Sequence, residues 1–411
     1  MSRHRVEYIR WLTAPLLRGG KRPPFWLLVA VTASGTLAMH ILVPVLPLAA
    51  NDLGVSPGRI QLSITLYLFG VAGGQLLYGL ASDKFGRRPT LLAALILYVV
   101  AGAVAGWATS IAALVGARVA QGIGGCGGLV LGRAIVRDSA APGEAASRMA
   151  LLTMVQSLAP GIGPAIGGIL GAWFGWRSIF TLLVGLGILT LGGVWLALPE
   201  TARSRGMSRD GRMFGSWLRL LRSPVFCGYM FGGALTSTSF FAYLTASPFI
   251  FTQLLHRPAA EVGVYYLAVM SGVPLGSFTA SRLASRVRLT ALLRVTSGTA
   301  VLGAALFFLV SATGTLSVVS VVGTMIIFSS GVGAAAPLAI TSAISTDPHA
   351  IGAASGLYGF VQMANGALCT LVVGLCPADP ALAAASVLFA SLLLGQCFFL
   401  LAIRSRPRAG G

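Results

Sequence analysis

The sequence predicts an all-α membrane protein with twelve transmembrane helices in two six-helix bundles, and with both chain termini in the cytoplasm. Three observations predict this fold: an apolar composition, long runs without charge, and basic residues gathered in alternate loops. Of the 411 residues, 56% are hydrophobic and only 9% are charged. Soluble domains carry about 25% charged residues, so the charges in this chain are too few to cover a water-exposed surface.

Long apolar runs are the units that cross a bilayer, because about 20 helical residues span its hydrocarbon core. Stretches such as 91–105 and 381–402 are apolar almost throughout, whereas the strands of a membrane barrel alternate apolar and polar residues. The runs therefore predict helices. Twelve spans are expected near residues 25–50, 60–80, 91–108, 111–132, 149–172, 178–198, 224–250, 262–282, 290–311, 315–340, 352–376 and 381–403.

The longest polar stretch divides the predicted spans into six and six. We expect a cytoplasmic tail at 1–24, a first bundle at 25–198, a cytoplasmic linker at 199–223, a second bundle at 224–403 and a final tail at 404–411. No cleaved signal peptide is expected, because the apolar run that follows the basic tail is too long.

Lysine and arginine set the orientation, since they gather in cytoplasmic loops. With the N-terminus inside, 25 of the 29 basic residues lie in the cytoplasm; Arg59, Arg177 and Arg257 lie outside, and Arg118 lies within a span. The net charge of +19 therefore reflects membrane topology, and no nucleic-acid partner is expected.

No metal site, cofactor or membrane-embedded enzyme is expected. The five cysteines and four histidines are dispersed, without the spacing of a metal site. The glycine-rich run at 122–127 fits a dinucleotide fingerprint. It lies inside a predicted span, however, and not between a strand and a helix as that fingerprint requires.

A weak internal repeat indicates two related halves. The sequence ASDKFGR at 81–87 follows the second span, and ASRLASR at 280–286 follows the eighth, an offset of 199 residues. Parallel repeats of this kind place the substrate site between the halves, near the middle of the bilayer.

The loop after the second span carries the most specific motif. Residues 79–89 read GLASDKFGRRP and closely resemble the signature of the major facilitator superfamily. Residues 118–122 resemble its fourth-helix motif, and residues 161–168 resemble its fifth-helix antiporter motif. VPVLP at 43–47 and RAIVRD at 133–138 resemble the Bcr/CflA group of drug:proton antiporters. The resemblance covers most of the N-terminal half, whereas the C-terminal half matches only in general plan.

The resemblance implies a conformational latch made of Gly79, Asp83, Gly86, Arg87 and Arg88. The glycines permit tight turns, and Asp83 can face the positive N-terminus of a neighbouring helix. In the family this contact holds the two halves together when the outside is closed. The simpler alternative is that Arg87 and Arg88 only set the topology.

The antiporter-type motif of the fifth span combines small residues with prolines: Pro160, Gly163, Pro164, Gly167 and Gly168. These residues permit close packing and a bend in the helix. The alternative is a well-packed helix with no further role, since small residues serve packing in all membrane proteins.

Arg118 lies inside the fourth span, with Gln121 one turn further on. A charge at membrane depth costs about 2.5–3.5 kcal/mol, so Arg118 is expected to face a central cavity or a partner. The alternative is a structural arginine that is bonded to backbone carbonyls.

In the drug-exporting relatives an acidic residue lies four positions before the first proline of the motif at 43–47, and His40 stands there in this chain. Because histidine has an unperturbed pKa of about 6.5, we hypothesise that His40 couples transport to protons. If Arg118 shares the cavity, the pair instead attracts anions. A third interpretation is a neutral histidine that is hydrogen-bonded within the bundle.

Aromatic and amide side chains of the C-terminal half are candidates for the substrate cavity: Phe240, Tyr243, Tyr266, Tyr358, Gln362 and Asn365. A pocket of this kind suits amphipathic, drug-like molecules. The alternative is that the tyrosines pack the core or anchor the chain at the membrane surface.

The function expected from these features is efflux of drugs, antibiotics or other small molecules from the bacterial inner membrane. The mechanism is proton antiport by alternating access, in a protein that is expected to be a monomer. The alternative within transport is a proton-independent exchanger or facilitator for an anionic metabolite, because all ten carboxylates lie in loops or at span ends.

Overall fold

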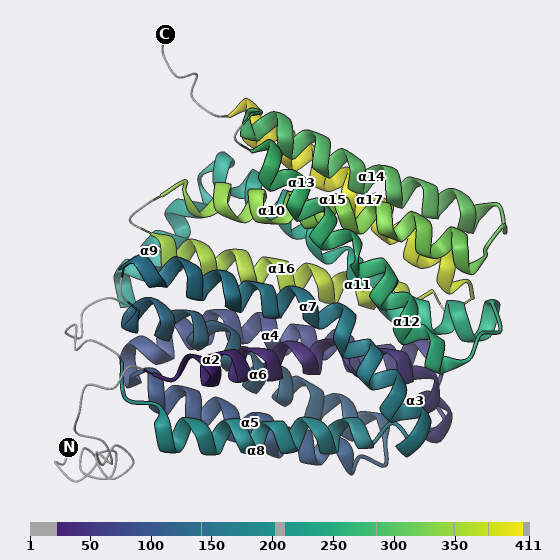
Figure 1. Ribbon diagram of the computed structural model, residues 1–411, viewed down its shortest axis with the longest axis horizontal. Helices are drawn as coiled ribbons and strands as arrows, with labels where there is room; N and C mark the ends of the chain where they lie inside the picture. Colours follow the sequence, from purple (N-terminus) through teal and green to yellow (C-terminus); the bar gives the residue numbers. More distant parts are fainter. Residues whose placement is uncertain are drawn as a thin grey trace.

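The computed structural model describes residues 23–140, 142–201, 210–284, 286–347, 350–376 and 378–405. In this part of the chain twelve helical segments are long and apolar enough to cross a membrane, which confirms the predicted number (Figure 1). The predicted N-terminal tail lies almost entirely outside the described residues, as does most of the C-terminal tail.

The helices of the N-terminal half are α2 (Phe25–His40), η1 (Val43–Val45), α3 (Leu46–Asp52), α4 (Pro57–Phe85), α5 (Arg87–Gly106), α6 (Ile111–Ser139), α7 (Pro142–Phe174) and α8 (Ser178–Ala197). Those that follow are α9 (Asp210–Leu221), α10 (Pro224–Thr238), α11 (Phe240–Phe249), η2 (Ile250–Leu254), α12 (Ala259–Met270), α13 (Gly272–Leu283), α14 (Leu289–Ala312), α15 (Val318–Ile344), α16 (Ile351–Gly374) and α17 (Pro380–Arg404).

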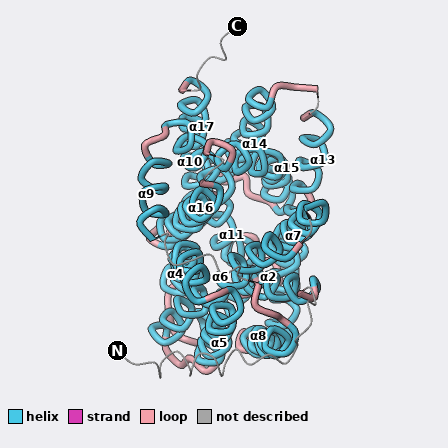
Figure 2. Tube along the Cα trace, turned by 90° about the vertical axis from the view of Figure 1, so that its left-hand side faces the viewer, coloured by secondary structure: helices cyan, strands magenta, loops and turns pink. Residues whose placement is uncertain are grey.

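The chain forms two groups of helices. One group holds α2 to α8 and the other holds α10 to α17, with α7, α11 and α16 near the boundary between them (Figure 2). We call the end of the bundle that carries α9 the linker end, and the other end the far end. The linker at 199–223 was predicted without a helix, but the structure places α9 within it.

Exposed tryptophans mark both ends of the bundle. Trp26 and Trp195 lie toward the linker end, and Trp107 and Trp173 lie at the far end; all four are more than half exposed. Tryptophan concentrates where a membrane meets water, so these two belts are consistent with a bilayer that surrounds the helices between them.

Two spans are interrupted at matching positions. The first span leaves α-helical geometry after His40 and continues through η1 into α3. The seventh is interrupted at Ser239, between α10 and α11. These positions differ by the same 199 residues as the repeat in the loops. In the first span, Pro44 and Pro47 lack the N–H groups that a continuous helix needs.

The two halves meet through close contacts, mainly between α4 and α16 and between α7 and α12. Along α4 these contacts run from Gly58 at the far end to Gln75, whose side chain would lie 2.9 Å from a methyl group on Gly359. A methyl group on Gly58 would lie 2.2 Å from the carbonyl oxygen of Gly374, so the two backbones nearly touch. Further along, the hydroxyls of Thr65 and Thr370 are 2.7 Å apart. Glycine is needed at position 58 because any larger side chain would separate the helices.

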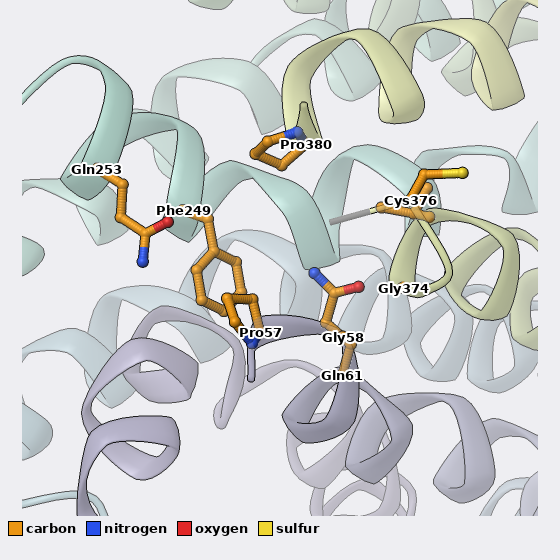
Figure 3. Close-up of a pocket in the computed structure, with 9 residues that line it drawn as sticks. Pro57, Gly58, Gln61, Phe249, Gln253, Gly374, Cys376 and Pro380 are labelled. Atoms are coloured by element: carbon orange, nitrogen blue, oxygen red, sulfur yellow. The ribbon is translucent and has the colours of Figure 1, made fainter. Parts of the chain in front are cut away.

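A small pocket lies beside this contact, among the far ends of α4, α11, α16 and α17 (Figure 3). Gln61, Phe249 and Gln253 line it, and its volume is about 10 Å³. That space suits at most one water molecule. It therefore reflects imperfect packing at the closed end and is too small for a substrate.

We expect Gly58→Ala to loosen the far end, because the added methyl group cannot fit against the Gly374 carbonyl. The measurement is the rate at which a maleimide modifies Thr65→Cys in detergent, after Cys227, Cys376 and Cys397 are replaced by serine. Buried Thr65 should react slowly in the parent and severalfold faster with Gly58→Ala.

The matched control for this test is Gly73→Ala on the same helix, where an added methyl group meets no atom within 4 Å. Equal labelling rates in the two glycine variants would contradict the close-contact interpretation.

Candidate functional site

His40 lies at the end of α2, where the first span is interrupted between the two halves. Its ring is 4% exposed and stacks on Phe241 of α11, with 5.8 Å between ring centroids. Its Nδ1 lies 2.9 Å from the carbonyl oxygen of Thr36. That oxygen can only accept a hydrogen bond, so Nδ1 carries the hydrogen and Nε2 is the basic nitrogen of the neutral ring.

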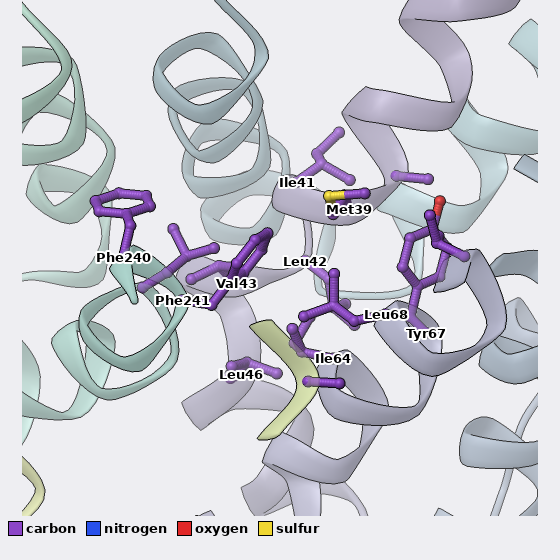
Figure 4. Packing of buried hydrophobic residues seen from close by; sticks show 14 of the residues in the cluster. Met39, Ile41, Leu42, Val43, Leu46, Ile64, Tyr67, Leu68, Phe240 and Phe241 are labelled. Carbon is purple, nitrogen blue, oxygen red and sulfur yellow. The ribbon is translucent and has the colours of Figure 1, made fainter. Parts of the chain in front are cut away.

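Apolar side chains surround the interrupted segment. Ile41 to Leu46 are buried, and they lie between residues of α4 such as Ile64 and Leu68 and the aromatic pair Phe240 and Phe241 of α11 (Figure 4). His40 is therefore a polar group at the edge of an apolar contact between the halves.

Arg118 is enclosed within the N-terminal half and is fully buried. Its Nη2 donates to the carbonyl oxygen of Ala38 at 2.9 Å, its Nε donates to that of Ser63 at 3.3 Å, and its Nη1 donates to Oε1 of Gln121 at 2.8 Å. The guanidinium also lies 4.0 Å from the ring centroid of Tyr67. It thus supplies hydrogen-bond donors near the C-terminal end of α2, where a positive charge is favoured.

The structure brings Arg118 and Gln121 together, as their spacing predicts. Arg118 and His40 both bind carbonyls of the last turns of α2, but their other contacts differ. Arg118 contacts α4 and α6, whereas the ring of His40 faces α11. The contacts of Arg118 match the alternative of a structural arginine bonded to carbonyls.

The glycines of the fifth-span motif pack directly against the interrupted segment. A methyl group on Gly163 would lie 3.1 Å from Cβ of His40, and one on Gly167 would lie 1.9 Å from the carbonyl oxygen of Ile41. Pro160 and Pro164 lie inside the continuous helix α7, and Gly168 is buried. The motif thus provides the small surface that lets α7 approach the end of α2.

The other side of the same motif faces the C-terminal half. A methyl group on Gly263 of α12 would lie 2.7 Å from Cα of Ala165 and 3.1 Å from the carbonyl oxygen of Pro164. Helix α7 is therefore in contact with His40 on one side and with the opposite half on the other.

The loop between α4 and α5 is held by ion pairs within the N-terminal half. Arg87 pairs with Asp83 at 2.8 Å and with Asp138 at 3.0 Å, and it also donates to the hydroxyl of Ser82. Arg88 donates to the carbonyl oxygen of Trp195 at 2.7 Å. Gly86 adopts a positive φ of 95°, which explains the glycine there; Gly79 lies one turn before Asp83 in α4.

Glu200, which the sequence did not single out, lies at the N-terminus of α5, next to this loop. Its carboxylate accepts the backbone N–H groups of Arg87 and Arg88 at 2.9 and 3.2 Å, where the partial positive charge of α5 is greatest. Asp83 was expected to face such a terminus. In this structure its side chain is instead 60% exposed and pairs with Arg87.

The predicted substrate residues divide into two sets. Tyr243, Tyr266 and Tyr358 are almost fully buried, so in this conformation they pack the core of the C-terminal half. Phe240 stacks on Phe328 of the same half and also lies beside the interrupted first span (Figure 4). The tyrosines are not at the membrane surface.

Gln362 and Asn365 form the second set, which is only partly buried. They donate to the hydroxyls of Ser237 and Thr238 at 2.9 and 3.0 Å. Those hydroxyls lie two residues and one residue before the interruption at Ser239. The polar groups of α16 and the interruption in the seventh span are therefore neighbours. The 199-residue repeat offset, applied to position 40, is the signal in the sequence that would have found this interruption.

Comparisons with known proteins identify the family of this chain. The family model described as the Major Facilitator Superfamily matches residues 27–370. A chloramphenicol resistance protein from Pseudomonas aeruginosa is 30% identical, over 84% of this chain and 82% of its own. A bicyclomycin resistance protein homolog from Haemophilus influenzae is 29% identical, over 78% of this chain and 80% of its own.

Among solved structures, the chain is similar to a bacterial homolog of the human lysosomal transporter Spinster in an inward-facing, unoccupied conformation. The TM-score is 0.72 at 16% identity, with 98% of this chain and 99% of the other covered. The match spans the whole twelve-helix arrangement. The protein is therefore a transporter of a bacterial inner membrane that belongs to the Major Facilitator Superfamily.

Proposed function

We propose that this transporter exports amphipathic small molecules, antibiotics among them, in exchange for protons. The relatives named for bicyclomycin and chloramphenicol resistance support the direction and the class of substrate. Alternating access between the two six-helix bundles at 25–198 and 224–403 carries the movement in a monomer, with the linker end in the cytoplasm as its basic loops indicate.

The observation that carries the proposal is the position of His40. Among the described Asp, Glu, His, Lys and Arg residues, His40 and Arg118 are the two that are buried. Arginine keeps its proton in proteins. Histidine gains and loses one in the physiological range, so His40 is the group suited to proton exchange.

The surroundings of His40 supply a coupling mechanism. Nε2 is free to take a proton while Nδ1 holds the Thr36 carbonyl. A protonated ring is disfavoured in an apolar contact with Phe241, so protonation favours separation of the halves at that contact. Deprotonation favours their closure, and movement of the halves is thereby linked to the charge of the ring.

Contacts of Arg118 weigh against the alternative of an anion exchanger. An anion site needs a positive group with free donors that faces the translocation route. The guanidinium of Arg118 is instead occupied by two carbonyls and an amide oxygen. The substrate contacts we favour are Gln362 and Asn365, whose partly exposed amides lie beside the interruption in the seventh span.

The loop between α4 and α5 acts as the latch of the state in which the linker end is closed, and not of the outside-closed state that the resemblance implied. In the present conformation the contacts between the halves run from the far end as far as Gln75, and the carboxylate of Asp83 beyond them is largely exposed. When the halves approach at the linker end, Asp83 becomes available to a helix N-terminus of the other half. In the present conformation, contacts among Arg87, Asp138 and Glu200 stabilise the structure of this loop.

We expect His40→Gln to abolish efflux driven by a pH gradient while passive substrate exchange survives, because glutamine keeps a polar group of similar reach but does not titrate. The measurement is transport of chloramphenicol and related antibiotics in proteoliposomes under an imposed pH gradient. The control is His256→Asn at the far end, since His256 has a φ of 51° that asparagine tolerates. Uphill efflux at the parental rate in His40→Gln would refute the coupling role.

Arg118→Gln should lower the temperature of unfolding in detergent. The carbonyl oxygen of Ala38 and Oε1 of Gln121 lose their donors, and each unpaired buried group costs about 1–3 kcal/mol. Arg118→Lys should recover part of the loss, and Arg286→Gln at an exposed position should leave the unfolding temperature unchanged. A fully stable Arg118→Gln protein that has lost exchange of organic anions would favour the anion exchanger instead.

Asp83→Asn is expected to slow transport by about 2- to 30-fold, the range of one charge–dipole contact, without lowering expression or the unfolding temperature. Glu144→Gln is the matched control, because Glu144 also forms a 3.0 Å ion pair four residues along a helix at the linker end. If both variants transport at the parental rate, Asp83 has no latch role.

A further inference from the structure

Helix α9 connects the two halves and is attached to the second of them. Leu220 is 2% exposed and packs with Phe226, Met230 and the start of α16 around Ala350. Trp217, one turn earlier, packs against the same cluster. One face of α9 is therefore fixed to the linker ends of α10 and α16.

The apolar surface of α9 continues beyond this fixed face. Leu218 and Leu221 are 43% and 45% exposed. Successive residues of a helix are rotated by about 100°. Viewed down the axis of α9, Trp217, Leu221 and Leu218 are therefore neighbours in that order. The described part of α9 thus has an apolar stripe of which one side is covered by protein and the other side is open.

Two arginines border the open side of the stripe. Arg222 comes next to Leu218 around the helical path, followed by Arg219, and both residues are exposed. Arg219 donates to the hydroxyl of Ser216 at 3.2 Å. Within the described residues neither guanidinium forms an ion pair with a carboxylate.

The helix lies at the linker end of the bundle, the end toward which the exposed Trp26 and Trp195 lie. In Figure 1, α9 is at the left end of the bundle, next to the starts of α10 and α16. An amphipathic helix at that level, with leucine on one face and arginine at its border, has the composition of helices that lie in the membrane interface. The leucines fit the boundary of the acyl chains, and the arginines fit phosphate groups.

We propose that α9 is an interfacial helix that binds anionic phospholipid headgroups through Arg219 and Arg222, with Leu218 and Leu221 inserted at the edge of the acyl region. Each basic residue near an anionic membrane surface contributes about 1 kcal/mol of attraction. Because Leu220 fixes α9 to α10 and α16, the lipid surface holds the linker ends of two helices that move during transport.

The test places a bimane fluorophore on Leu221→Cys, after Cys227, Cys376 and Cys397 are replaced by serine. The full-length protein is reconstituted with brominated phosphatidylcholine or brominated phosphatidylglycerol, which quench the fluorophore on contact. We expect quenching by both lipids, with phosphatidylglycerol preferred. The double variant Arg219→Gln/Arg222→Gln should reduce that preference by up to about 30-fold, the equivalent of two such attractions.

The control variant is Arg282→Gln/Arg286→Gln, which removes the same charge from exposed positions near the linker end of α13, on another side of the C-terminal half (Figure 2). It should leave the preference unchanged. If neither lipid quenches the fluorophore, the proposal is overturned. It is also overturned if the quenching disappears when two copies of the chain associate, because a second copy would then cover Leu221. Equal quenching by both lipids in the parent would overturn the anionic site. The readout needs no substrate, so it stands apart from the test of proton antiport.

Discussion

Backbone carbonyls freed inside a membrane must find donors, and the interrupted first span is where this requirement is greatest. The carbonyl of Ala38 in the last turn of α2 accepts a hydrogen bond from Arg118 of α6. In the turn before it, the helical carbonyls of Ser34, Gly35 and Thr36 accept further hydrogen bonds from Tyr98, Tyr67 and His40, respectively. Leaving the carbonyl of Ala38 unpaired in lipid would cost several kcal/mol. Arg118 therefore stabilises the interruption, while Tyr67 and Tyr98 hold α2 against α4 and α5.

Glycine provides the space that this arrangement needs. A methyl group on Gly35 would lie 2.4 Å from the carbonyl oxygen of Gly125, and one on Gly128 would lie 2.4 Å from that of Val31. Close backbone approach brings the donors of α4 and α6 within reach of α2. The glycine-rich run at 122–127, which fits a nucleotide fingerprint by spacing alone, is thus part of a helix–helix contact.

Sequence reasoning found the features that composition and local spacing encode. Long uncharged runs predict the twelve spans, and the motif residues of the fourth and fifth helices lie around the end of α2. The role of Glu200 and the surroundings of Arg118 depend on residues distant in the chain, so the periodicity of the sequence carries no record of them. Helix α9 was missed because its apolar stripe is short and lies in a polar stretch that suggested an irregular linker.

The ion pairs of the described residues all lie within one half or the other, such as Arg87 with Asp138 and Arg177 with Asp52. Across the halves, the contacts are glycine surfaces, aromatic rings and a few neutral hydrogen bonds. Separating the halves therefore breaks no charge pair of this set, and salt in the medium has little to screen at that boundary. Under the proposed coupling at His40, protonation of a single ring would therefore introduce charge into a boundary that no ion pair of this set crosses.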